Sequence, residues 1–248
     1  MKLLKKKSSD TTLLQGDCFE VMKGLPDKSV DLVLTDPPYY FRSHQNRSVG
    51  ADGKSAYANS DLYKEGNKLS TMGSFTKEDV YNLLNECERV LKKFRGYFFC
   101  NEYLVPFYTN WALEHKYWFC IITLEKPLKV VNRNRYSTNA EYLIRIYKPG
   151  AGIKVLDYSD ENNDVNWLSS VQAFDRIPKK LHPAEKPLNI LNGVIQLNTD
   201  PNDVVLDPFM GSGSTGVVCI NSHRKFIGIE LDEKYYNIAV DRCEKSHR

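Results

Sequence analysis

The chain reads Val30-Asp31-Leu32-Val33-Leu34-Thr35-Asp36-Pro37-Pro38-Tyr39 at the point that decides its expected fold. The first five residues are mostly branched and apolar and are followed by turn formers, a pattern typical of a short buried strand. Asp36 therefore lies at the carboxyl end of a strand, the edge where open α/β sheets bind their ligands. The two prolines fix φ and lack a backbone donor, so the carbonyls of Asp36 and Pro37 face outward with no competing N–H nearby.

These four residues, Asp36, Pro37, Pro38 and Tyr39, are the candidate catalytic residues. An exocyclic amine on adenine or cytosine is a poor nucleophile, because its lone pair is delocalised into the ring. A carboxylate and a rigid carbonyl that each accept one N–H would localise that lone pair and stabilise the charge that develops during methyl transfer. The flat face of Tyr39 suits a base rotated out of the duplex. The pattern favours an enzyme that methylates a base amine, although a prolyl turn that merely ends a strand carries the same letters.

Composition limits the class of protein. The chain has 248 residues, 42% of them hydrophobic, which suffices for the core of one α/β domain. The formal net charge of +3 does not identify a nucleic-acid partner by itself. The six cysteines show no CxxC spacing and predict reduced thiols. We find no signal peptide and no apolar run of membrane length, so we expect a cytoplasmic protein without a membrane partner.

Hydrophobic patterns predict alternating strands and helices along most of the chain. We expect strands at residues 13–17, 30–35, 97–100, 118–124, 141–148, 204–206 and 226–229. We expect helices that begin at Thr76 and end near Gly96, that include residues 104–112, and that follow Pro187 and Gly213. The strands at 118–124 and 141–148 suit an antiparallel hairpin at a sheet edge. Residues 40–74 form a long polar loop, and residues 149–180 have no regular pattern.

A second group of candidate residues follows the strand at 204–206, where the chain reads Asp207-Pro208-Phe209-Met210-Gly211-Ser212-Gly213-Ser214-Thr215. Glycines let the backbone pass close to a ligand, and the helix start offers free N–H groups. Neither a phosphate loop nor GxGxxG is present, and a plain strand-to-helix turn is the alternative. Glu230 ends the next strand, at an offset from which a carboxylate accepts both ribose hydroxyls in nucleotide-binding sheets.

Together these motifs resemble the beta class of amino DNA methyltransferases, which use S-adenosylmethionine. The resemblance is carried by DPPY at 36–39, HPAEKP at 182–187, DPFMGSGST at 207–215 and GIEL at 228–231. The base-site motif precedes the cofactor motif, a circular rearrangement that distinguishes this class. The resemblance implies a single-domain Rossmann-like methyltransferase fold of the α/β class, circularly permuted, with a mixed seven-stranded sheet and helices on both faces. That domain would span residues 1–248, with a loop insertion at 40–75 and a short target-recognition segment at 149–180.

The resemblance also implies roles for individual residues. Phe209 to Gly213 would line the methionine end of the cofactor, Glu230 would hold its ribose, Asp17 would accept from its adenine amine, and Lys186 would approach its carboxylate. The expected cofactor-binding residues are Asp17, Cys18, His182, Lys186, Asp207, Phe209, Gly211, Ser212, Gly213, Ser214, Thr215, Glu230 and Leu231. No metal site is expected, since His182 has no partner ligands at suitable spacing.

Basic residues recur in the loop-like stretches. They are candidates for DNA contacts, and a solvated surface is the equal alternative. These residues are Arg42, Arg47, Lys54, Arg133, Arg135, Lys179 and Lys180.

The residue before the prolines bears on the target base. Family members that act on adenine N6 usually resemble DPPY, whereas those that act on cytosine N4 more often have serine there. We therefore expect a site-specific DNA adenine-N6 methyltransferase of the restriction-modification kind, with cytosine N4 as the alternative. A catalytically silent DNA-binding module is the alternative from another class. The resemblance further admits a homodimer and a cognate restriction endonuclease as partners.

Overall fold

The structure is a computed structural model that describes residues 4–7, 10–39, 75–132, 135–153, 170–173 and 185–246, with backbone alone for 4–7, 127–132 and 135–139. The strands are β1 (Leu4–Lys7), β2 (Thr11–Gln15), β3 (Leu32–Thr35), β4 (Arg95–Cys100), β5 (Trp118–Asn132), β6 (Arg135–Tyr147), β7 (Val171–Ala173), β8 (Val204–Asp207) and β9 (Lys225–Glu230). The helices are α1 (Cys18–Met22), α3 (Lys77–Val90), α4 (Val105–Glu114), α5 (Leu188–Asn198), α6 (Ser214–Asn221) and α7 (Glu233–Ser246).

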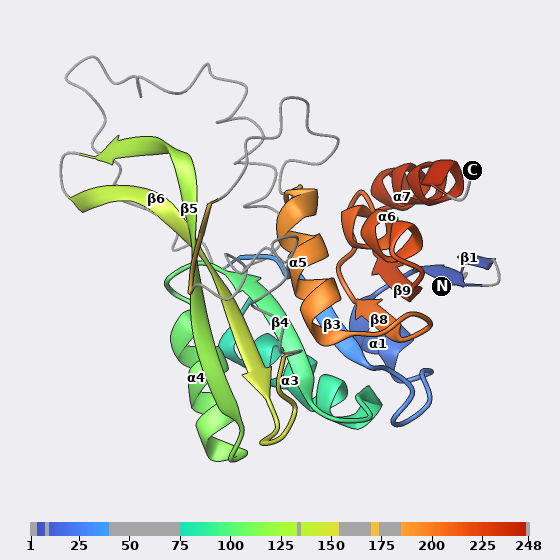
Figure 1. Ribbon diagram of the computed structural model, residues 1–248, viewed down its shortest axis with the longest axis horizontal. Helices are drawn as coiled ribbons and strands as arrows, with labels where there is room; N and C mark the ends of the chain where they lie inside the picture. The colour runs from blue at the N-terminus through green and yellow to red at the C-terminus, as the bar shows by residue number, and fades with distance from the viewer. Residues whose placement is uncertain are drawn as a thin grey trace, which may run out of the picture.

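The strands form one sheet in the order β1-β2-β9-β8-β3-β4-β6-β5-β7 (Figure 1). Within it β1 and β6 run against the other strands. The stretch from β2 to β5 is the expected mixed sheet of seven strands, with β6 as its antiparallel member. The expected strand number was wrong, because β1 and β7 add one strand at each edge. β1 is rich in lysine and β7 has three residues, so neither carries the apolar pattern that predicts a strand.

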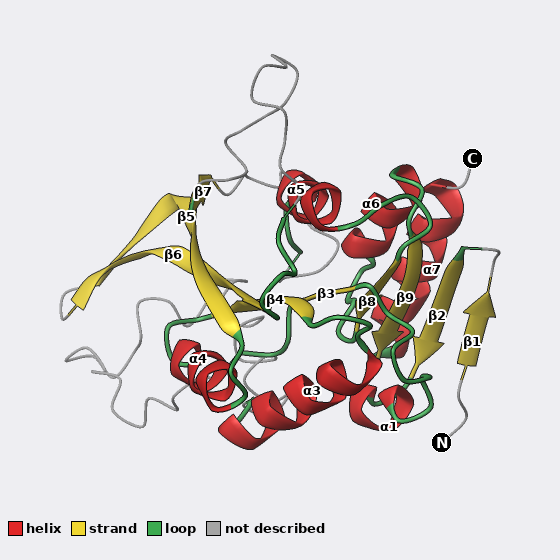
Figure 2. Cartoon of the chain, turned by 60° about the horizontal axis from the view of Figure 1, so that its bottom comes forward, coloured by secondary structure: helices red, strands yellow, loops and turns green. Residues whose placement is uncertain are grey.

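Helices cover both faces of the sheet, as expected (Figure 2). α1, α3 and α4 pack on one face, and α5, α6 and α7 pack on the other. Successive side chains of a strand point to opposite faces, so Val33 joins the first core and Leu32 and Leu34 join the second. All three are fully buried. The central strand β3 is therefore held from both sides, as parallel strands usually are.

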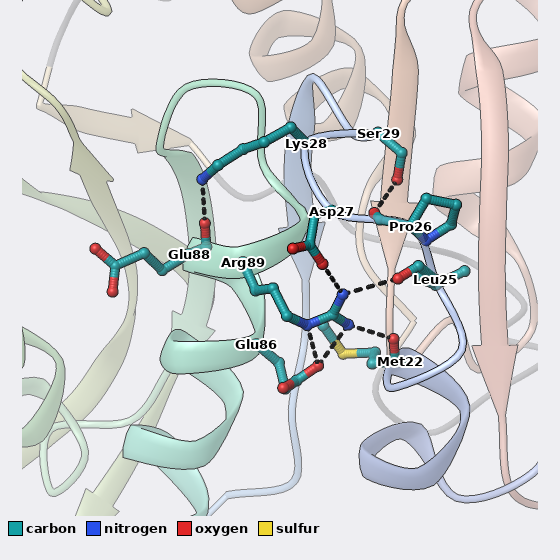
Figure 3. A network of polar contacts seen from close by, with 9 residues as sticks. All are labelled: Met22, Leu25, Pro26, Asp27, Lys28, Ser29, Glu86, Glu88 and Arg89. Carbon is teal, nitrogen blue, oxygen red and sulfur yellow. Dashed lines mark hydrogen bonds and ion pairs between the residues drawn. The ribbon is translucent and has the colours of Figure 1, made fainter.

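Arg89 of α3 fastens the loop that leads from α1 into β3 (Figure 3). Its Nη1 donates to the carbonyl of Leu25 at 2.8 Å and to Asp27 Oδ1 at 2.6 Å. Its Nη2 donates to the carbonyl of Met22 at 2.7 Å and to Glu86 Oε2 at 2.8 Å. One guanidinium thus binds the last carbonyl of α1, one loop carbonyl and two carboxylates, and it fixes the entry into the strand that ends at the candidate catalytic residues.

The limits of α3 confirm one prediction and correct another. Thr76 begins the helix as expected: its hydroxyl accepts from the N–H of Asp79 at 3.2 Å, and Asp79 Oδ2 accepts from the N–H of Thr76 at 2.8 Å. The helix ends at Val90, however, and Gly96 lies inside β4. A Cβ at Gly96 would lie 2.6 Å from the Phe98 ring, so this glycine provides space for an aromatic side chain and does not stop a helix.

The predicted hairpin is confirmed, since β5 and β6 pair in antiparallel fashion, beginning with Trp118 opposite Tyr147. It is not the last pair of the sheet, because β7 adds in parallel to β5. β7 lies within residues 149–180, for which we expected no regular structure. Residues 154–169 and 174–180 of that segment lie outside the described residues, as do residues 40–74, where we expected a loop. No described helix is both long and apolar enough to cross a membrane.

Candidate active site

Four neighbouring parallel strands bring the predicted site residues to one edge of the sheet. β2, β9, β8 and β3 lie side by side and run in the same direction. Asp17 follows β2, Glu230 ends β9, Asp207 ends β8, and Asp36 follows β3. The carboxyl ends of parallel strands share an edge, so these four carboxylates lie along it in that order.

The two carboxylate oxygens of Asp36 have different surroundings. The side chain is 16% exposed, and its Oδ2 accepts from Lys186 Nζ at 2.7 Å. Its Oδ1 is buried and has no hydrogen-bond partner among the residues that the structure describes. A buried carboxylate oxygen left unpaired costs free energy, so this atom is a ready acceptor for a donor that enters the site.

Lys186 lies at the centre of a buried polar cluster. Besides Asp36, its Nζ contacts Glu141 Oε1 at 3.0 Å and the hydroxyl of Tyr39 at 3.1 Å. Tyr39 in turn donates to Glu141 Oε1, and Lys126 Nζ lies 3.3 Å from Glu141 Oε2. Lys186 and Glu141 are 7% and 4% exposed, so the two charges are removed from water together.

The cluster keeps Lys186 charged. Burial alone would lower the pKa of this lysine, but attraction to Asp36 and Glu141 and their hydrogen bonds outweigh it and raise the pKa above its ordinary value. Lys186 therefore acts as a fixed cation beside the Asp36 carboxylate. The role that we expected for it, at the carboxylate of the cofactor, stays a prediction.

Asp207 joins the end of β3 to the glycine turn. Its Oδ1 accepts from the hydroxyl of Thr35 at 2.7 Å and from the N–H of Phe209 at 3.1 Å, and its Oδ2 accepts from the hydroxyl of Thr215 at 2.7 Å. Burial raises the pKa of the carboxyl to about 6, and the three hydrogen bonds oppose that rise. Both oxygens of Asp207 are thus used inside the protein, where they fix the turn against the catalytic strand.

The glycine turn has the backbone form that its sequence suggests. Gly211 and Gly213 have φ of 52° and 81°, a region that residues with a Cβ seldom adopt. Gly213 is the N-cap of α6 and supplies no side-chain cap to the first N–H groups of that helix. A Cβ on Gly213 would lie 2.9 Å from the Cβ of Ala239. The turn can therefore bring uncapped backbone donors close to a ligand.

Glu230 is held beside this turn. Its Oε2 accepts from the N–H of Gly211 at 2.9 Å, and its Oε1 accepts from the N–H of Asp232 at 2.8 Å. Burial raises the pKa of its carboxyl. Each carboxylate oxygen can accept a second hydrogen bond, so the fixed side chain keeps acceptor capacity for a ligand with hydroxyl groups. On the neighbouring strand, Asp17 Oδ1 caps α1 through the N–H of Phe19 at 2.9 Å.

Arg242 of α7 binds the glycine turn through hydrogen bonds. Its Nη1 donates to the carbonyl of Ser212 at 3.0 Å and to the hydroxyls of Ser212 and Ser214 at 2.9 and 3.2 Å. Its Nη2 lies 2.9 Å from Glu185 Oε1, which also accepts from Ser214 at 3.3 Å. The segment that precedes α5 is therefore tied to the turn.

The structure also describes the side chains of Cys18 and Leu231, whereas for the remaining expected site residues it gives the backbone alone or no description. Cys18 is buried in the core that α1 shares with α3, and burial raises the pKa of its thiol. Leu231 is 59% exposed. For Arg135 the structure describes the backbone alone. His182, Arg42, Arg47, Lys54, Arg133, Lys179 and Lys180 lie outside the described residues.

From the sequence we assigned no role to Glu141, Thr35 or Arg242. The sequence did contain a hint of Glu141. It lies two residues before Leu143 on strand β6, so both side chains point to the same buried face. A carboxylate buried there needs a partner. For Thr35 and Arg242 there was no such hint, since a strand-ending threonine and a helical arginine are common on protein surfaces.

Known proteins resemble this chain over most of its length. Type II methyltransferase M.HinfI of Haemophilus influenzae is 29% identical over 94% of this chain and 68% of that protein. Putative methylase YubD of Escherichia coli is 31% identical over 95% of this chain and 91% of that protein. DNA adenine methyltransferase YhdJ of Escherichia coli is 27% identical over 94% of this chain and 82% of that protein.

Solved structures share the fold. The M1.HpyAVI complex with SAM superposes with a TM-score of 0.62 at 24% identity, over 94% of this chain and 99% of that one. The cytosine-N4-specific PvuII DNA methyltransferase superposes with a TM-score of 0.66 at 17% identity, over 95% of this chain and 87% of that one. The family model described as DNA methylase, of the N6/N4 type, matches residues 30–241. With most of its length inside that match, the chain belongs to the N6/N4 DNA methylase family.

Proposed function

We propose that this DNA methyltransferase transfers a methyl group from S-adenosylmethionine to the exocyclic N6 amine of adenine at specific sites in DNA. The observation that carries the proposal is Asp36 Oδ1, a buried acceptor next to two prolines and Tyr39 that has no hydrogen-bond partner within the described part of the chain. A base amine is a donor that fits such an acceptor, because its N–H groups would satisfy an oxygen that is costly to leave unpaired.

Asp36 and Pro37 would act on the amine in concert. The N6 amine has two hydrogens, and we assign one to Asp36 Oδ1 and the other to the Pro37 carbonyl. These two acceptors localise the nitrogen lone pair and stabilise the positive charge that grows as the new N–C bond forms. S-adenosylmethionine, when bound, would supply the methyl group from its sulfonium: the electron pair of the broken C–S bond would stay on sulfur, and the methylated nitrogen would lose one proton to solvent along its hydrogen bond to Asp36. The ring of Tyr39 offers a face for the base.

The other half of the edge would hold the cofactor. We assign Glu230 to the ribose hydroxyls and the turn from Phe209 to Gly213 to the methionine end. The residues present fit these roles, since Glu230 is fixed by two backbone donors and the turn carries positive φ at Gly211 and Gly213. Asp17, on the strand beside Glu230, is assigned to the adenine amine of the cofactor.

Adenine is preferred to cytosine on two grounds. The residue before the prolines is aspartate, and a relative that is similar over 94% of this chain is named as a DNA adenine methyltransferase. Cytosine N4 is the second candidate, because a solved enzyme of the same fold is cytosine-N4-specific and both bases carry an exocyclic amine. The same two acceptors suit either amine.

Methyl-labelled S-adenosylmethionine and unmethylated plasmid DNA test the proposal, with nucleosides analysed after digestion. We expect N6-methyladenine, and a loss on the order of 100- to 1000-fold in Asp36→Asn because an amide cannot supply the same charge to the transition state. Asp31→Asn is the matched control, since Asp31 has the same side-chain exposure of 16% and precedes the same strand. Label found in N4-methylcytosine alone would contradict the choice of base. A folded chain that binds DNA and transfers no label is a silent module.

A further inference from the structure

We infer that Lys186 and Glu141 are positioning residues that orient the Asp36 carboxylate for methyl transfer, a role that rests on the function proposed above. The resemblance to amino methyltransferases places Lys186 at the carboxylate of the cofactor instead. The two roles make different demands on the same ammonium group, and its contacts separate them.

The donors of Lys186 are already used. An ammonium has three N–H donors, and the acceptors within reach are Asp36 Oδ2 at 2.7 Å, Glu141 Oε1 at 3.0 Å and the hydroxyl of Tyr39 at 3.1 Å. A cofactor carboxylate would have to displace one of them, and the side chain is only 7% exposed. Lys186 therefore serves the base-binding half of the site.

The contact with Lys186 determines which oxygen Asp36 presents. Because Oδ2 is bound to the ammonium, Oδ1 is left as the buried oxygen without a partner among the described residues. Without the cation, the carboxylates of Asp36 and Glu141 would face each other in a buried site, and their repulsion would turn Asp36 out of this orientation. Glu141 and Lys126 complete a cluster whose formal charges cancel.

Glu141 holds Lys186 in this place. Its side chain is 4% exposed, and Oε1 accepts from both Lys186 and Tyr39. The residue before the lysine, Glu185, is fixed by Arg242 at 2.9 Å, and the residue after it, Pro187, is the N-cap of α5. The backbone on both sides of Lys186 is therefore anchored, so the ammonium is a rigid support for Asp36.

Four variants test this role in the full-length chain: Lys186→Met, Lys186→Arg, Glu141→Gln and Lys92→Met. Calorimetry measures the Kd for S-adenosylmethionine, and single-turnover transfer of labelled methyl groups to unmethylated plasmid DNA measures the rate at saturating cofactor. We expect Lys186→Met to slow transfer on the order of 100-fold, the effect of a misplaced reacting group, while the Kd stays within about twofold. Lys186→Arg should recover part of the rate because it keeps the charge. Glu141→Gln should slow transfer without changing the Kd.

Lys92→Met is the control, because Lys92 Nζ pairs with Asp31 Oδ2 at 2.8 Å just before the same strand and lies away from the site. It should leave both quantities unchanged. A Kd raised about tenfold or more in Lys186→Met, with a normal rate at saturation, would overturn the inference in favour of a cofactor contact. If Lys186→Met does not fold, a normal rate in Glu141→Gln overturns it as well. An unmodified chain that binds the cofactor and methylates no DNA contradicts the proposed function, whereas an active chain with unaffected variants contradicts the positioning role alone.

Discussion

At the scale of single residues, Glu230 combines two tasks. It closes the glycine turn through the N–H of Gly211, and it accepts from the N–H of Asp232 at the start of the next segment. These bonds hold the carboxylate in one orientation before any ligand arrives. Burial raises the pKa of the carboxyl, and the backbone donors oppose that rise because they favour the ionised form. The side chain is thus prepared to accept hydroxyl donors.

Glu230→Ala should weaken the binding of S-adenosylmethionine by about 10- to 100-fold, the cost of losing hydrogen bonds to a charged acceptor. Calorimetry checks this directly. Glu233→Ala, which removes an exposed carboxylate three residues away, should bind as the unmodified chain does. Asp36→Asn should also keep its cofactor affinity. Unchanged binding in Glu230→Ala would contradict the assignment of the ribose to this residue.

At the scale of elements, the candidate catalytic strand depends on a helix that is distant in sequence. β3 has four residues, and contacts at its start add to the packing that holds it from both sides. Arg89 of α3 binds the loop before it, and Asp31 Oδ2 accepts from the N–H of Val204 at 2.9 Å at the start of β8. The start of β3 is therefore held by a helix and a strand that lie elsewhere in the sequence.

Arg89→Met should lower the free energy of unfolding by about 2 kcal/mol, because the carbonyls of Met22 and Leu25 lose their partly buried donor. Urea titration followed by circular dichroism measures the change. Lys23→Met removes an exposed ion pair with Glu20 and should have no measurable effect. Equal midpoints for Arg89→Met and the unmodified chain would show that the loop does not need this guanidinium.

At the scale of the whole molecule, Asp207 connects two parts of the chain that are far apart in sequence. Thr35 and Asp207 are 172 residues apart, and their hydrogen bond joins the strand of the candidate catalytic residues to the strand of the glycine turn. The carboxyl is fully buried, and burial raises its pKa from the ordinary value of 3.8 to about 6. The folded protein therefore binds this proton more tightly than the unfolded chain does.

The sign of the pH dependence follows from this raised pKa. The stability that protonated Asp207 contributes is complete below the ordinary pKa and is lost as the pH rises toward 6. The difference in unfolding free energy between the unmodified chain and Asp207→Asn should fall by about 2 to 3 kcal/mol between about pH 3.5 and 7. Urea titrations across this range measure it. A difference that does not change with pH would contradict the raised pKa.

Most of the strands and helices, and their order along the chain, followed from the sequence alone. Alternating apolar residues, a threonine before an amphipathic helix, and glycines after a short strand act through neighbours in the chain, so their consequences can be predicted locally. The strands expected at 30–35 and 204–206 and the helix that begins at Thr76 were of this kind. β1 and β7 were not, because edge strands obtain their hydrogen bonds from a partner strand and carry little apolar pattern of their own.

The partner of Lys186 was decided by the tertiary structure. A lysine between glutamate and proline could pair with any nearby carboxylate, and its sequence neighbours do not say which one. Asp36 lies 150 residues away and Glu141 lies 45 residues away, and only the packing of β3, β6 and the segment before α5 brings the three charges together. The physical reason is that charge pairing depends on distance in space and on burial, which local patterns of residues do not encode.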